Sequence, residues 1–499
     1  RDQPRSRGLG DVYKRQAYKS ATAPSQKLFV SFYKTDLTGG TYMQSSIINE
    51  IIAVFPNILL HREEEYCSVA DSTWAILPAF EECARNFNSD SNEERALKKY
   101  FSENEIFKDK YSAVANASKA KPFVFDDKSN VGLLFGNDLN ISASQVEKFS
   151  LCRFSYFCNY GLNVRERRKA EINPLEYGTF IHYIMEVFFS KYSKNKFSNM
   201  SEDDINKECD SILDDYVNKH FGGSQKNTPR FMYRFNKIRE NVHFLVLHII
   251  EELKNSGFEP VDCELKIDGD IPGYEVVLPT GQKILLRGSV DRVDILKKGE
   301  ENYIRIIDYK TGSKEFKLSD ILYGLNLQML IYLYAITLGG EERYGKVTPA
   351  GILYMPATVK PISADNTISD EQINEQVSKG LKMNGMLLNS LDVIDNSDAA
   401  YISFNTKNGT LTAGGSLASL EELGMIFKKL DMTVAKMGTT LYSGNVEASP
   451  LKGGKDSCEY CPYDSICAYH MSDCRNSFSL KNDEVCRILE EEQENGGEE

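Results

Sequence analysis

The spacing of apolar residues changes its period along the chain. Between about 175 and 256, apolar positions recur three and four residues apart, which indicates amphipathic helices. From 261 to 309 they alternate instead, in a stretch rich in Val, Ile and Tyr that is interrupted by Pro272-Gly273, Pro279-Thr280-Gly281 and Lys298-Gly299-Glu300. Alternation between such turn residues predicts strands joined by hairpins.

The helical period returns after this meander. The pattern predicts a helix at about 320–338, a strand at 349–355, and long helices at roughly 370–390 and 416–440. Helices, a strand meander and then helix–strand–helix predict an α/β fold in which helices flank a mixed sheet.

Weaker patterns come first in the chain. Residues 27–33 predict a strand and 45–55 an amphipathic helix, whereas 62–135 are mostly helical in pattern. At Ser142, with Gln145 three residues later, a capping box predicts the start of a new helix.

These patterns divide the chain into parts. We expect residues 1–26 to be an artefact or disordered, because Gly8–Gln16 resembles a translated sequencing adapter. The chain does not begin with Met, so we expect a fragment that is truncated at its N-terminus. Residues 27–135 are expected to form a first region that ends in a helical linker, and 138–475 the main domain.

Composition limits the classes of protein. With 41% hydrophobic and 26% charged residues among 499, the chain is expected to be globular, with two or three domains. It has no run of about 18 uncharged apolar residues and no signal peptide, so we expect no membrane segment and a cytoplasmic location.

The net charge of −13 argues against a surface that is basic throughout. Part of that charge lies in an acidic tail, 476–499, whose end from Glu490 onward we expect to be disordered. A local basic cluster is formed by Arg165, Arg167, Arg168 and Lys169.

Two strands of the meander carry the most informative polar residues, Asp291 and the segment Asp308-Tyr309-Lys310. A hairpin would pair these strands, and two carboxylates held close repel each other unless a cation lies between them. Oxygen ligands favour Mg²⁺ or Mn²⁺. Lys310 lies two residues past Asp308 and points to the same face of the strand. The groups needed for metal-assisted phosphodiester hydrolysis therefore meet here, although each residue alone is also common at strand ends.

Two predicted helices add candidate groups. His182 follows Gly178 by four residues on an otherwise apolar helical face, where a lone His is more often a core residue than a ligand. Gln328 and Tyr332 also lie four residues apart, so they share a helix face, which ordinary packing would explain equally well.

The cysteines near the C-terminus form the pattern C-x₂-C-x₅-C, with Cys458, Cys461 and Cys467. Because a chain without an export signal keeps its thiols reduced, clustered cysteines indicate a metal site. Three ligands need a fourth, for which Cys152 is the best candidate and Cys158 the alternative. Four cysteines could also bind a structural zinc ion, but zinc sites usually show two close pairs of ligands.

In this order the motifs resemble the RecB-like branch of the PD-(D/E)XK nuclease superfamily. The resemblance implies a nuclease fold whose metal is held by His182, Asp291, Asp308 and the backbone carbonyl of Tyr309. Glu264 is a further candidate, as the Glu that this family often carries on an upstream strand. Lys310 would assist the attacking water. The Gln-x-x-x-Tyr helix, with Gln328 and Tyr332, would line a DNA channel.

The division of the cysteines into one plus three resembles the iron–sulfur staple of the AddB-type nuclease domain. It implies a [4Fe–4S] cluster on Cys152, Cys458, Cys461 and Cys467, ahead of zinc. Residues 27–57 resemble the end of the helicase-like region of the same family.

The resemblance implies a DNA exonuclease subunit that processes double-strand breaks in the bacterial cytoplasm. It would act on a single-stranded DNA end together with an AddA-type helicase–nuclease subunit. Two alternatives remain open: a stand-alone exonuclease of the CRISPR-associated kind, and a non-catalytic DNA-binding scaffold.

Overall fold

The computed structural model of the chain describes residues 14–34, 41–55, 57–58, 73–118, 124–125, 127, 129–165, 174–221, 229–312, 316–358, 369–403, 406–407, 410–411, 417–454, 456–467, 469 and 474–495. Chain contacts divide it into two compact units, Arg1–Ala120 and Lys121–Glu499. In the part of the chain that is described, no helix is both long and apolar enough to cross a membrane.

The boundary between the units lies earlier than the sequence suggested. Helix α7 (Ser129–Phe135), which we assigned to the linker, belongs to the second unit. Val131 is buried there, and the ring of Phe135 stacks on that of Tyr156 with centroids 6.0 Å apart. The apolar side chains of α7 are therefore part of the larger domain's core.

The regular secondary structure described for the first unit is helical. Its helices are α2 (Ser46–Val54), α4 (Ile76–Arg85), α5 (Asn92–Glu103) and α6 (Lys108–Ser118). A small core joins α4 and α5 to the start of α6, with Ala79, Cys83, Phe101 and Phe107 buried.

The strand expected at 27–33 is wrong: this segment has no regular secondary structure, and no described strand pairs with it. Residues 14–22 lie in the stretch 1–26 that we expected to be an artefact or disordered, and they are helical. The predicted helix at 45–55 is confirmed as α2.

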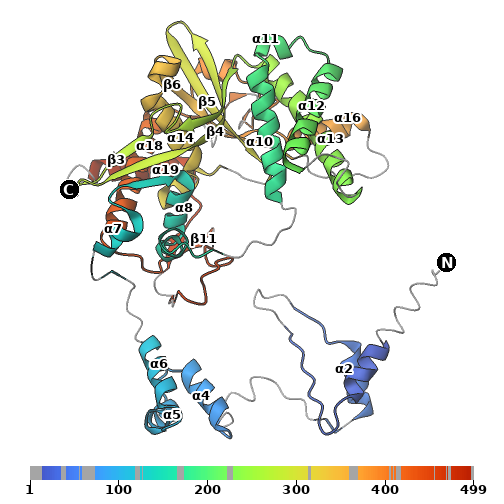
Figure 1. The fold of residues 1–499 in the computed structure, drawn as a ribbon, viewed down its shortest axis with the longest axis vertical. Coiled ribbons are helices and arrows are strands. Elements are labelled where there is room, and N and C mark those ends of the chain that lie inside the picture. Colours follow the sequence, from blue (N-terminus) through green and yellow to red (C-terminus); the bar gives the residue numbers. More distant parts are fainter. Residues whose placement is uncertain are drawn as a thin grey trace, which may run out of the picture. The chain divides into compact units, whose positions relative to one another are not determined.

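The second unit is built on an eight-stranded mixed sheet (Figure 1). Six strands follow the order β1-β4-β5-β6-β7-β10, and β2 and β3 both pair with β4. The strands are β1 (Leu139–Ser142), β2 (Glu259–Ile267), β3 (Tyr274–Val277), β4 (Lys283–Lys298), β5 (Glu301–Lys310), β6 (Val347–Pro356), β7 (Asn384–Leu388) and β10 (Leu417–Ala418).

The meander predicted over 261–309 is confirmed by β2 to β5. Strand β4 pairs antiparallel with β2 and β5, and β5 pairs parallel with β6. Of the helix predicted over 370–390, the first half is confirmed as α16 (Asp370–Gly380). The second half is wrong, because it contains strand β7. Strand β5 is central: seven consecutive residues are buried, as expected of a strand that is covered on both faces.

Helices cover this sheet. Helix α10 (Pro174–Lys191) packs against β2, β4 and β5, and α14 (Gln328–Gly339) packs against β3, β5 and β6. The others are α8 (Ala143–Leu151), α9 (Arg153–Tyr156), the π-helical turn η2 (Phe157–Gly161), α11 (Lys194–Phe197), α12 (Glu202–Phe221), α13 (Pro229–Asn255), the 3₁₀ turn η4 (Leu318–Tyr323), α15 (Glu341–Tyr344), α17 (Leu391–Asp395), α18 (Leu420–Tyr442) and α19 (Asn482–Asn495). Short strands β8 (Thr406–Lys407) and β9 (Thr410–Leu411) form one ribbon, and β11 (Leu451–Gly453) and β12 (Arg475–Ser477) form another.

The C-terminal tail corrects a further expectation. Residues 482–495 form α19, which packs on α18 and η4 (Figure 1). Val485 and Leu489 are buried, and Lys429 of α18 pairs with Glu492 at 2.6 Å. The acidic composition suggested disorder, but apolar residues four apart give this segment one face that the domain covers.

We therefore expect Leu489→Ala to lower the free energy of unfolding by about 2–4 kcal/mol, because a buried Leu loses its packing. Urea denaturation followed by circular dichroism measures this change. The exposed neighbour Glu491 is the control, and Glu491→Ala should stay within about 0.5 kcal/mol. Equal stability of the two variants would mean that α19 does not pack on the domain.

Candidate metal and active site

Three elements bring His182, Glu264 and Asp291 together. Nδ1 of His182, on α10, lies 3.4 Å from Oε1 of Glu264 on β2 and 3.4 Å from Oδ2 of Asp291 on β4. The ligand atoms of these side chains all lie within 4.8 Å of one another. Among the described residues, no other group of three His, Cys, Asp or Glu side chains is this close.

The position of Glu264 follows from strand register and a local distortion. Cys263 pairs with Arg292 and Leu265 with Val290, so Glu264 lies opposite Asp291. Its φ of 52° is in the left-handed region, which costs energy for a residue other than glycine. The Ser289 hydroxyl donates a 2.8 Å hydrogen bond to Oε2 of Glu264 and holds the carboxylate in place.

Sequence reasoning named Glu264 only as an additional candidate. The alternation of β2 does not reveal which β4 residue lies opposite, and no sequence signal marks the positive φ. The structure places Glu264 in the group as a full member, within 3.4 Å of His182.

The charges of this group suit a cation. Burial alone would lower the pKa of His182, but hydrogen bonds to Asp291 and Glu264 outweigh it and raise this pKa to about 10. The His182 contact in turn lowers the pKa of Glu264 despite its burial. Two carboxylates that recruit a proton so strongly provide the donor set and charge that suit a divalent cation.

Asp308 and Lys310 lie beside this group, on β5. Nζ of Lys310 is 2.8 Å from Oδ1 and 2.6 Å from Oδ2 of Asp308. The amide of Tyr309 donates a 2.8 Å hydrogen bond to Oδ2 of Asp291, so the hairpin pairing that we predicted brings the two aspartates side by side. Asp308 is not part of the three-residue group, because its carboxylate is turned to Lys310.

Helix α14 places the remaining candidates against the site. The Tyr332 side chain is buried and hydrogen-bonds Gln328. Burial and the charges of Asp291 and Asp308 raise the pKa of Tyr332, so its hydroxyl stays protonated.

Gly288 on β4 has a steric reason to be glycine, whereas Gly178 on α10 has none. A methyl group on Gly288 would lie 2.2 Å from the hydroxyl oxygen of Tyr332, so only glycine lets the tyrosine reach β4. A methyl group on Gly178 would lie 4.0 Å from the side chain of Thr311, an ordinary contact between α10 and the end of β5.

A buried charge network lies beneath the site. Asp294 accepts hydrogen bonds from Arg292 at 2.8 Å and from Arg305 at 3.0 Å, and Arg305 reaches Glu252 at 2.7 Å. Both guanidiniums and Asp294 are 0% exposed, and Glu252 is 2% exposed. Arg292 also donates to the Tyr309 hydroxyl at 3.3 Å, which ties the network to the segment after Asp308.

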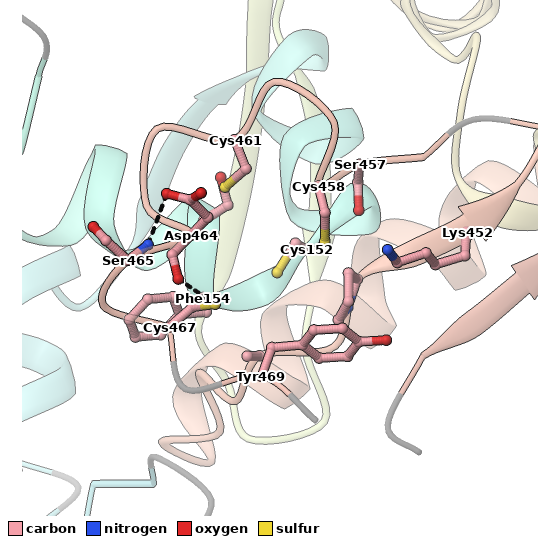
Figure 2. A pocket seen from close by; sticks show the side chains of 13 residues that line it. Cys152, Phe154, Lys452, Ser457, Cys458, Cys461, Asp464, Ser465, Cys467 and Tyr469 are labelled. Atoms are coloured by element: carbon pink, nitrogen blue, oxygen red, sulfur yellow. Dashed lines mark hydrogen bonds between the residues drawn. The ribbon is translucent and has the colours of Figure 1, made fainter. Parts of the chain in front are cut away.

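The four predicted cysteines line one pocket of about 300 Å³ (Figure 2). Cys152 comes from the end of α8, and Cys458, Cys461 and Cys467 come from the turns between β11 and β12. Cys158, the alternative, is buried in the domain core and does not line this pocket.

Two other residues lie near this pocket without lining it, Cys158 and Arg475. Burial, together with the charges of neighbouring cysteines, raises the pKa of Cys158 to about 11. Arg475 donates hydrogen bonds to the carbonyls of Ser150, Leu151 and Ser449, and so fastens the end of α8 to the segment before β11.

Of the basic cluster noted in the sequence, Arg165 is exposed, whereas Arg167, Arg168 and Lys169 lie outside the described residues.

This geometry agrees with a comparison against known families. The sequence pattern of the PD-(D/E)XK nuclease superfamily matches residues 140–468. The chain belongs to this superfamily. The match begins at β1 and ends just after Cys467, so it contains the sheet, the metal-site residues and all four pocket cysteines.

Curated relatives cover nearly the whole chain. It is 30% identical over 517 residues to the B subunit of the ATP-dependent helicase/deoxyribonuclease of Clostridium acetobutylicum, which aligns with 97% of this chain and 44% of that protein. The B subunit of the same name from Ruminiclostridium cellulolyticum is 31% identical over 93% of this chain and 43% of its own length. The chain thus spans less than half the length of these relatives. The resemblance of this chain to the AddB family is confirmed.

Loss of one member of the buried network should destabilise the domain. Asp294→Ala should lower the free energy of unfolding by about 3–5 kcal/mol, because it leaves two buried guanidiniums short of a partner. Thermal and urea unfolding measure the loss. Glu275→Ala is the matched control, since its pair with Lys283 is exposed and should contribute at most about 1 kcal/mol. A stable Asp294→Ala protein would show that the network does not support the sheet.

Proposed function

We propose that the chain is the nuclease-bearing part of a bacterial helicase–nuclease B subunit. It cleaves single-stranded DNA at processed double-strand breaks, for recombinational repair. The observation that carries the proposal is the convergence of His182, Glu264 and Asp291 beside the Asp308–Lys310 pair, within a PD-(D/E)XK fold. The relatives named as helicase/deoxyribonuclease subunits support it over residues outside the nuclease domain as well.

The donor set fits Mg²⁺ or Mn²⁺. His182, Glu264 and Asp291 would hold the ion, with Asp308 and the carbonyl of Tyr309 as the further ligands that the family resemblance implies. When bound, the ion would lower the pKa of a coordinated water and neutralise charge on the phosphodiester. Glu264 extends the ligand set proposed from the sequence, because it lies nearer to His182 than Asp308 does.

The neighbouring side chains have distinct tasks. Lys310 is a cation held in place by Asp308, where it orients the attacking water and stabilises negative charge that develops on the phosphate. Gln328 and the protonated hydroxyl of Tyr332 offer hydrogen-bond donors to the DNA strand. The strand would be delivered by an AddA-type helicase–nuclease subunit in a heterodimer.

The cysteine pocket fits a [4Fe–4S] cluster. A single zinc ion with Zn–S bonds of about 2.3 Å needs sulfurs roughly 3.8 Å apart. No three of the pocket's sulfurs lie within 4.8 Å of one another, although all four cysteines are among the described residues. A cavity of about 300 Å³ lined by four thiols supports the larger group. Its ligation would close a loop of about 300 residues around the catalytic sheet.

Two alternatives are less well supported. A stand-alone CRISPR-associated-type exonuclease would not explain the similarity to B subunits over 93–97% of the chain. A non-catalytic scaffold would not need the pairing of Asp308 with Lys310 next to a cation site.

Asp308→Ala should abolish Mg²⁺-dependent cleavage of single-stranded DNA, a loss of at least about 10³-fold, because Lys310 and the metal site both lose a partner. Cleavage is measured on an end-labelled oligonucleotide, with the AddA-type partner present. Folding and iron content should stay unchanged. The exposed Glu275→Gln on the same sheet is the control and should cleave normally. Full activity of Asp308→Ala would mean that the active site lies elsewhere.

Cys461→Ala should release iron from anaerobically purified protein and lower its thermal stability, because the cluster loses one of four ligands. Iron analysis and the visible absorption spectrum measure this. Cys152→Ala should do the same, whereas Cys158→Ala should keep the iron while weakening the core. Cys486→Ala, on α19, is the control. A colourless wild-type protein that binds zinc would overturn the cluster and leave the nuclease proposal intact.

A further inference from the structure

Helix α14 carries the DNA-facing pair, Gln328 and Tyr332, but lacks a cap of its own. Its N-cap residue is Leu327, whose side chain cannot accept a hydrogen bond from the first turn. The first amides of a helix have no partner within the helix and need one from elsewhere. Leu327 is buried, so water does not readily serve this end of the helix.

The missing acceptor comes from a distant part of the chain. Oε1 of Glu147 accepts hydrogen bonds from the amide of Leu327 at 2.9 Å and from that of Gln328 at 3.4 Å. Glu147 lies on α8, 180 residues earlier in the chain than Leu327. A carboxylate at this end also suits the positive pole of the helix dipole.

Helix α8 is itself held firmly, so it can serve as a reference point. Ser142 and Gln145 form a capping box at its start. At its end, Arg475 binds the carbonyl of Ser150, and the side chain of Ser150 fills the space where a Cβ on Gly324 would be, 2.2 Å away. Cys152 of the cysteine pocket follows directly.

We infer that Glu147 is a positioning residue for the DNA-facing end of α14. Its carboxylate fixes the amides of Leu327 and Gln328, and so sets where Gln328 and Tyr332 stand relative to Asp291 and Asp308. This role rests on the proposed nuclease function, because Gln328 and Tyr332 are assigned to the DNA strand there. Glu147 itself touches neither the three-residue group nor Lys310 in any contact that the structure describes.

Hydrogen exchange tests the contact without any activity. Glu147→Ala should speed exchange of the amides of Leu327 and Gln328 about five- to tenfold, the factor that corresponds to a lost helix cap. Glu147→Gln keeps an acceptor oxygen and should restore most of the protection. The control is Glu422→Ala, which removes a comparable cap contact to Ser419 on α18 and should leave the two α14 amides unchanged. Unchanged exchange in Glu147→Ala would overturn the inference.

Cleavage and binding test the positioning. Glu147→Ala should lower kcat/KM on single-stranded DNA about tenfold, and the same substitution in a Gln328→Ala background should add little, since the two residues act as one unit. Additive losses would mean that Glu147 acts by general stability alone. Fluorescence anisotropy in Ca²⁺ measures oligonucleotide affinity for the wild type, the two single variants and the double variant. The losses of affinity should be non-additive in the same way. If the wild type binds DNA but never cleaves it, the proposed function fails while exchange and binding still decide the role of Glu147.

Discussion

Strand β4 holds the site together because it is paired along both edges. Its second half is hydrogen-bonded to β2 on one side and to β5 on the other, and these pairings set Glu264 and Asp308 on either side of Asp291. The carboxylates of Glu264 and Asp291, which lie within 4.8 Å of each other, repel in the absence of a cation. The backbone ladders supply the force that keeps them there, and His182 and Lys310 supply positive charge.

The same strand carries residues of both the buried network and the candidate metal site. Successive residues of a strand point to opposite faces, so Asp291 faces His182 whereas Arg292 faces Asp294 and Glu252. A buried ion network contributes little net stability by itself, but removing one member is costly. This network therefore makes the register of β4 and β5 hard to change, and the register is what positions the carboxylates.

Outside the sheet, distant segments meet through side chains that cap backbone groups. Arg475 binds the carbonyls at the end of α8, and Glu147 binds the amides at the start of α14. Helix α8 thus contacts both the cysteine pocket and the helix that faces the metal site. The cysteines come from two places about 300 residues apart, and only a closed domain brings them to one pocket.

The α/β class, the strand meander, the pairing of Asp291 with the Asp308–Lys310 strand and the cluster of Cys458, Cys461 and Cys467 could be predicted from the patterns of the chain itself. These follow from local periodicity, turn residues and motif spacing, which a linear chain displays directly. Only the folded domain shows that Glu264 joins His182 and Asp291, that Gly288 makes room for Tyr332, and that residues 482–495 of the acidic tail form α19. Each of those depends on which distant side chain lies opposite, and strand register and burial are set by packing across the whole domain.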